Sequence, residues 1–161
     1  MQKYHFPNGN FTDFWEVMQN KKVHFFYQDV RFSFFNRNAL KLFVEKLFRL
    51  ECKQLKQLNV IFCTDEALLS INREFLSHDY YTDIITFPLS AKGQPVEAEL
   101  YISVDRVREN GKKQRIKFST ELHRVLFHGC LHLTGYNDKS SQQIKKIRER
   151  EDHYLRLYFH E

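Results

Sequence analysis

Glycine, proline and cysteine are scarce in this 161-residue chain, which has 5 Gly, 3 Pro and 3 Cys. So little glycine and proline argues against long flexible linkers, and the length fits one domain. The cysteines, Cys52, Cys63 and Cys130, form no CxxC pair. Their odd number, without an apolar leader segment, suggests a reducing, cytoplasmic setting. No apolar run approaches the ~20 residues that span a bilayer, so no membrane partner is expected.

Aromatic and basic residues are plentiful instead. The chain is 42% hydrophobic and contains 16 Phe and 8 Tyr, which is ample for a core. Its formal net charge of +5 permits an anionic partner such as nucleic acid without establishing one. Basic residues gather over 106–124 and 145–150, a distribution that solvated helix faces also explain.

Hydrophobic periodicity predicts an α+β fold. Strands are expected over 23–27, 58–63, 82–87 and 98–103, the last two as a hairpin. Helices are expected after Asn36, after Thr64 or Asp65, from Asp105 to near Gly111, after Ser119 or Thr120, and from Ser140 or Ser141 to about Phe159. This order predicts a single domain, residues 21–161, with a mixed four-stranded sheet and packed helices. Residues 1–20 are an N-terminal extension of unknown role.

Four of these helices have apolar faces that should turn inward, and the face after Asn36 carries Leu40, Phe43, Val44, Leu47 and Phe48. The face after Thr64 carries Leu68, Ile71 and Phe75, and the last helix carries an inward seam of Ile144, Ile147, Glu151, Tyr154 and Tyr158. The carboxylate of Glu151 on that otherwise apolar seam needs a partner. The helix after Ser119 has a buried stripe of Leu122, Val125, Leu126, Gly129 and Leu133, with two histidines at its edge.

Those histidines, His128 and His132, lie four residues apart and therefore share a helix face. Gly135 suits a helix C-terminus, after which the chain can bring Asp138 to the same point. Two imidazoles and a carboxylate with an open position are typical of a catalytic zinc site at the C-terminal end of a helix. Manganese, iron or nickel fit the ligand types too. No nucleotide cofactor is expected.

The residue directly after the first histidine bears on which reaction the site could catalyse. Zinc proteases of the H-E-x-x-H pattern place their general base directly after the first histidine, where this chain has Gly129. A standard metalloprotease is therefore disfavoured, and Gly129 is better explained by close helix packing. Cys130 lies about 200° around the helix from each histidine, so it should point away from the metal and serve packing.

Residues 128–138 resemble the H-G-x-L-H-L-x-G-Y-x-[HD] signature of the bacterial YbeY family. Residues 82–88 resemble its T-[DN]-V-L-S-F-P strand, residues 98–103 its G-D-I-x-I-S strand, and 71–75 part of its L-N-x-x-Y-R segment. The resemblance spans roughly residues 20–158, with a weaker C-terminal match at Ile147 and Glu151. Two positions depart from it. Asp138 stands where the family often has histidine, and Leu76 stands where it has an arginine.

The resemblance implies a single-strand-specific metallo-endoribonuclease for ribosomal RNA processing (3′ maturation of small-subunit rRNA) and ribosome quality control. Single-stranded RNA and the small ribosomal subunit would be its partners. His128, His132 and Asp138 would hold one Zn²⁺ and its activated water, with the general base unknown. The candidates for substrate contact are Thr82, Asp83, Thr86, Arg73, Lys113 and Arg115.

Some alternatives stay open. Arg73 or a basic residue of the 112–117 loop could replace the arginine missing at Leu76. Tyr80 and Tyr81 could stack on unpaired bases, although core positions are the favoured interpretation. The chain could also be a non-catalytic ribosome-assembly or RNA-binding factor stabilised by metal, or a metallohydrolase of a non-RNA substrate.

Overall fold

The computed structural model describes residues 21–34 and 36–160. The predicted extension over 1–20 lies outside this range. The strands are β1 (Val23–Tyr27), β2 (Leu55–Cys63), β3 (Ile84–Pro88) and β4 (Val96–Ser103). The helices are α2 (Arg37–Leu50), α3 (Asp65–Leu76), α4 (Val104–Gln114), α5 (Phe118–Thr134) and α6 (Ser141–His160). None of these helices has the length and apolar character needed to cross a membrane.

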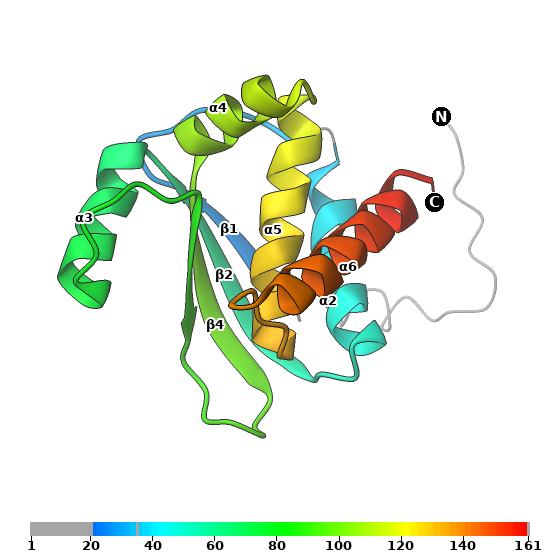
Figure 1. Cartoon of the computed structure of the whole chain (residues 1–161). Helices are drawn as coiled ribbons and strands as arrows, with labels where there is room; N and C mark the ends of the chain where they lie inside the picture. Colours follow the sequence, from blue (N-terminus) through cyan, green and yellow to red (C-terminus); the bar gives the residue numbers. More distant parts are fainter. Residues whose placement is uncertain (1–20, 35, 161) are drawn as a thin grey trace, which may run out of the picture.

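The strands form one mixed sheet in the order β1-β2-β4-β3. β1 pairs with β2, and β2 with β4, in parallel, while the β3–β4 hairpin is antiparallel. The predicted α+β fold with a mixed four-stranded sheet is thus confirmed. In Figure 1, α5 packs over one face of this sheet, and α3 lies on the other side of the strands. Helix α6 crosses α5 on the side that faces away from the sheet.

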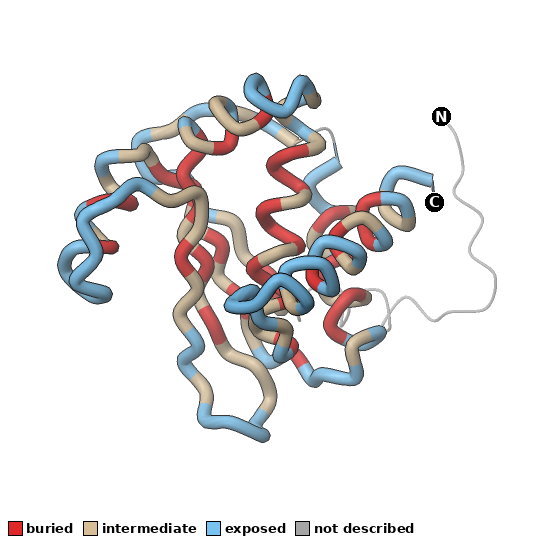
Figure 2. Tube along the Cα trace, viewed as in Figure 1, coloured by how far each residue is buried: buried red, intermediate tan, exposed pale blue. Residues whose placement is uncertain are grey.

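The alternation of side chains along β4 separates two apolar clusters. Leu100 and Ile102 belong to the main core, which also takes in the buried faces of α2, α5 and α6. Tyr101 packs on a smaller cluster that contains Leu68 of α3 and Ile85 of β3. Figure 2 shows buried residues concentrated along α5 and the strands, whereas most of α3 is exposed. Helix α5 is therefore the element most firmly held by the core.

Two helix ends differ from the prediction. Helix α4 continues past Gly111 to Gln114 and ends where Arg115 adopts a left-handed conformation at φ 57°. Gly111 instead allows a close approach, since a Cβ there would lie 3.3 Å from the carbonyl oxygen of Ile116. Helix α5 begins after Lys117, which makes no side-chain capping bond. The prediction of Ser119 or Thr120 as its cap was wrong by two or three residues.

Two apolar side chains predicted to be inward are exposed. Leu68 of the predicted face is buried, but Phe75 is 63% exposed, because the buried part of α3 ends at Asn72. Ile144 is 50% exposed, since Ile147 is the first residue of α6 to reach the core. The predicted caps Asn36 and Thr64 are confirmed, because their side chains accept bonds from the Ala39 and Ala67 amides.

Candidate metal centre

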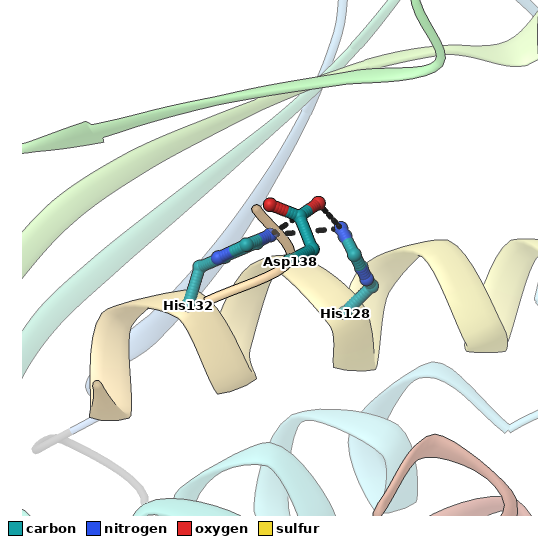
Figure 3. A group of neighbouring side chains, drawn as sticks. All are labelled: His128, His132 and Asp138. Carbon is teal, nitrogen blue, oxygen red and sulfur yellow. Dashed lines mark hydrogen bonds and ion pairs between the residues drawn. The ribbon is translucent and has the colours of Figure 1, made fainter. Parts of the chain in front are cut away.

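The predicted ligands come together beside the last two turns of α5. His128 and His132 project from one face of the helix, as the spacing predicts, and Asp138 returns from the loop that follows (Figure 3). Gly135 makes this return possible, because it ends the helix at φ 113°, a conformation that costs glycine little. One donor atom from each residue lies within 4.8 Å of the other two.

The distances between these donor atoms fit a tetrahedral ion. Nε2 of His128 and Nε2 of His132 are 2.9 Å apart. Oδ2 of Asp138 lies 3.8 Å from the first nitrogen and 3.5 Å from the second. Zinc–ligand bonds near 2.0–2.1 Å put neighbouring ligand atoms about 3.3 Å apart. The three separations bracket this value, so an ion can be bound with small side-chain adjustments.

The hydrogen bonds of the outer ring nitrogens also favour a cation. Nδ1 of His128 lies 2.7 Å from a Glu151 carboxylate oxygen, and Nδ1 of His132 lies 3.0 Å from the Tyr136 carbonyl oxygen. Both partners are acceptors, so each Nδ1 carries the proton and each neutral ring presents a bare Nε2 lone pair. Two lone pairs facing each other at 2.9 Å repel unless a cation or proton lies between them. The residues present therefore fit a bound metal.

Glu151 has the partner that the sequence required of it. Its side chain is 2% exposed, and its Oε1 accepts the His128 bond while its Oε2 pairs with Arg124 and Arg148. A carboxylate that accepts the outer proton of a metal-binding histidine fixes the ring and makes it a stronger ligand. The three C-terminal elements α5, the loop and α6 thus build the site together.

Gly129 allows α5, the helix that carries His128 and His132, to pack closely on the sheet. A Cβ at this position would lie 2.5 Å from Cδ1 of Ile84 and 3.0 Å from Cδ2 of Leu100. The absence of a side chain lets α5 approach β3 and β4 closely, as the sequence predicted. Cys130 is fully buried in the core, which confirms its packing role.

A groove of about 500 Å³ opens beside His132. The turn between β3 and β4 forms one wall, and the end of α5 forms another. Cys52 and Lys53, which follow α2, and Lys92 of the hairpin turn also line it. Of the three candidate ligands, His132 is the one that lines this groove.

The start of β3 brings a further carboxyl group near the site. Asp83 accepts a bond from Asn110 Nδ2 at 3.1 Å, and its pKa is raised because burial outweighs the opposing influence of His128. Thr82 precedes the strand, where its hydroxyl bonds the Ile84 carbonyl at 3.4 Å. Ile85 of β3 points toward α3, and neighbouring residues of a strand point to opposite faces. Thr86 therefore faces the side of the sheet that α5 covers.

The three basic residues predicted to contact the substrate do not contact the candidate metal ligands. Arg73 on α3 bonds Asp79, and Lys113 on α4 pairs with Glu109 of its own helix. Arg115 ends α4 and is exposed. None of these contacts involves a metal ligand, and all three residues stay predictions as substrate contacts. Tyr80 and Tyr81 are 57% and 49% exposed, so the core interpretation of them was wrong.

Sequence reasoning did not select Arg124 and Arg148, which both contact the Glu151 carboxylate. Their residue type gave no signal among the many basic residues around 106–124 and 145–150. The available signal was positional, because Arg148 lies one turn before Glu151 and Arg124 one turn before His128.

Comparison with known proteins places the chain in a family. The family model described as Endoribonuclease YbeY matches residues 20–158. The chain belongs to the YbeY family. A Cytophaga hutchinsonii protein named Endoribonuclease YbeY is 42% identical over 140 residues, which cover 87% of this chain and 98% of the relative. An Amoebophilus asiaticus protein of the same name is 36% identical, over 86% of this chain and 94% of the relative.

A solved structure supports the same conclusion. The solution structure of a Thermotoga maritima protein has a TM-score of 0.63 and 27% identity, and the match covers 85% of this chain and 89% of that one. The YbeY match includes His128, His132, Asp138 and Glu151. The whole candidate centre therefore lies within the part of the chain that YbeY proteins share.

Proposed function

We propose that this chain is a zinc-dependent endoribonuclease that cleaves single-stranded RNA. The proposal rests on the Nε2 atoms of His128 and His132, which lie 2.9 Å apart with their lone pairs facing each other. A hydrogen bond at Nδ1 fixes each ring, and the Asp138 carboxylate lies beside both nitrogens. Such an arrangement binds one divalent transition metal and leaves a coordination position open. The relatives carry the name endoribonuclease, and RNA is the substrate we assign.

The protein's own groups have separable roles in this proposal. When bound, zinc supplies a Lewis acid for phosphodiester hydrolysis. Glu151 and the Tyr136 carbonyl hold the two rings in the orientation that the metal needs. Asp83, whose pKa is raised by burial, is assigned to the substrate side of the start of β3, and Thr82 and Thr86 are assigned to the sheet side of the site. Arg73, Lys113 and Arg115 are proposed to contact the RNA backbone further out.

We further propose the biological setting that the family resemblance implies. The substrate would be ribosomal RNA, with 3′ maturation of the small-subunit species and ribosome quality control as the processes served. The small ribosomal subunit would be the partner, and the cytoplasm the compartment. The net charge of +5 is in keeping with an RNA partner.

The test combines metal content with cleavage. Purified protein should hold about one zinc per chain and cut a defined single-stranded RNA, with activity lost on chelation and restored by zinc. His132→Ala should abolish both cleavage and zinc binding while the far-UV and near-UV circular dichroism of the fold persist. His153→Ala, an exposed histidine on α6, is the matched control and should retain both.

Each other outcome points to another function. If His132→Ala unfolds the protein, the metal is structural and a non-catalytic assembly factor becomes the better interpretation. If zinc-loaded protein leaves RNA intact, the proposal is rejected and a hydrolase of another substrate is the remaining candidate.

A further inference from the structure

The buried carboxylate of Glu151 joins the metal site to two arginines. Its Oε1 accepts the bond from Nδ1 of His128 at 2.7 Å. Its Oε2 lies 3.2 Å from Nη1 of Arg124 and 3.1 Å from Nη1 of Arg148. One imidazole ring and one carboxylate therefore separate each guanidinium from the metal-binding Nε2 of His128.

The two arginines differ in exposure and in charge balance. The Arg124 side chain is 18% exposed, and its Nη1 lies 2.7 Å from Asp152 as well as contacting Glu151. Two carboxylates thus balance a largely covered cation. The Arg148 side chain is 55% exposed and pairs with Glu151 through Nη1. A guanidinium has five N–H donors, so this ion pair leaves Arg148 with donors for a further anion.

Arg148 reaches from α6 toward α5, because its Nη1 contacts the same Glu151 carboxylate that accepts the bond from His128. Burial raises the pKa of Glu121, a residue of α5 that is 3% exposed, and the charges of Arg124 and Arg148 oppose this rise. Glu121 lies seven residues before His128, and therefore on the same helix face. Arg148 thus lies near the face of α5 that carries Glu121 and His128, with Glu151 as its direct partner.

We propose that Arg148 is a phosphate-binding residue that holds the RNA backbone next to the metal centre. The inference rests on the proposed RNA substrate. A planar guanidinium matches the geometry of two phosphate oxygens, and such charge-assisted pairs are the strong ones. When Arg148 turns toward a phosphate, Arg124 and His128 still hold the Glu151 carboxylate. Substrate capture therefore does not dismantle the support of the metal ligand.

The experiment measures binding of the zinc-loaded full chain to a fluorescent, phosphorothioate oligouridylate of about 12 nucleotides across a salt series. Arg148→Ala should weaken binding about 5–10-fold at low salt and reduce the slope of log K against log salt by about 0.7, the loss of one phosphate contact. Arg148→Lys should keep the slope and recover part of the affinity, because it keeps the charge without the planar fork. The matched control is Arg156→Ala, which removes an exposed arginine further along α6 and should change neither quantity.

Zinc content separates a binding role from a structural one. Arg148→Ala should retain the zinc stoichiometry and thermal midpoint of the parent protein. Loss of zinc in this variant, an unchanged affinity and slope, or an equal effect of Arg156→Ala would each reject the proposal.

The same measurements keep this inference apart from the proposed function. Binding that depends on Arg148 without any cleavage of ordinary RNA would reject the nuclease proposal and support the phosphate contact. If the protein cleaves RNA with zinc, and Arg148→Ala changes neither kcat/KM nor RNA affinity, the nuclease proposal is supported and the phosphate contact is rejected.

Discussion

The carboxylate of Glu151 on α6 accepts a hydrogen bond from Nδ1 of His128 on α5 at 2.7 Å. This bond fixes which nitrogen of His128 faces the candidate metal. It also couples the docking of the last helix to the geometry of the site, since α6 supplies Glu151 while the core holds its apolar side.

Replacing Glu151 by glutamine should weaken zinc binding about 10–100-fold, because the amide accepts the bond without the negative charge that strengthens the ring as a ligand. Competition with a chromophoric chelator would measure the zinc Kd. Glu149→Gln, at a side chain that is 65% exposed on the same helix, is the control and should leave the Kd unchanged. Equal zinc affinities of the parent and the Glu151 variant would show that this contact does not tune the site.

Asp83→Asn should lower RNA cleavage by about tenfold or more, because an amide cannot exchange a proton with the substrate, and it should do so without lowering stability. Because burial raises the pKa of Asp83, ionisation of this carboxyl opposes folding as pH rises above the ordinary value of 3.8. An amide avoids that cost and keeps an oxygen for the bond from Asn110. Urea unfolding of the metal-free proteins should therefore show the variant gaining relative to the parent as pH rises from 4 to 7. A variant that loses stability at neutral pH would assign Asp83 a structural role.

Glu51→Gln should destabilise the protein by about 2 kcal/mol at neutral pH. Burial raises the pKa of Glu51, but hydrogen bonds from Tyr154 and Arg150 outweigh it and lower the pKa overall. A carboxyl with a lowered pKa stabilises the fold above its ordinary value of 4.5, and this contribution disappears as pH falls through the folded-state pKa.

Urea unfolding of the Glu51 variant and its parent should therefore give free energies that converge in acid. Glu66→Gln on the exposed side of α3 is the matched control and should show a much smaller pH-dependent gap, since its charge meets only the helix N-terminus. A difference that is constant from pH 7 to pH 3 would mean that shape, and not charge, sets the Glu51 contribution.

Gly129→Ala should destabilise the fold by about 1–3 kcal/mol, because the added Cβ meets side chains of both Ile84 and Leu100. Gly111→Ala is an informative comparison, since its nearest contact is 3.3 Å and alanine favours a helix by about 1 kcal/mol. Thermal unfolding should rank the Gly111 variant clearly above the Gly129 variant. The opposite order would show that α5 has room to move on the sheet.

The proximity of the three candidate ligands was predictable from sequence because helical spacing and a C-terminal glycine are local features. His128, His132 and Gly135 need no knowledge of the rest of the chain, and the loop after Gly135 limits where Asp138 can lie. The need of Glu151 for a partner was also visible in its apolar seam. Its identity as the support of His128 was not, because two helices had to be packed before these residues met.

The errors lie where tertiary contacts override local preference. Gly111 is typical of a helix end, yet it lies inside α4, where its lack of a side chain lets the backbone of Ile116 approach closely. Helix α5 starts without a capping side chain, so serine and threonine inside its first turn gave a misleading boundary. Phe75 lies at the C-terminal end of α3, where its ring meets Phe87 of β3 but stays 63% exposed.

The three thiols differ enough in accessibility to give the protein a built-in reporter. Cys130 is enclosed by the core, and burial together with Asp105 and Asp65 raises the pKa of the Cys63 thiol to about 12. Cys52 is exposed and borders the groove beside His132. A maleimide dye should thus attach to native protein at a single position, and its emission would register whatever enters the space next to the metal ligands.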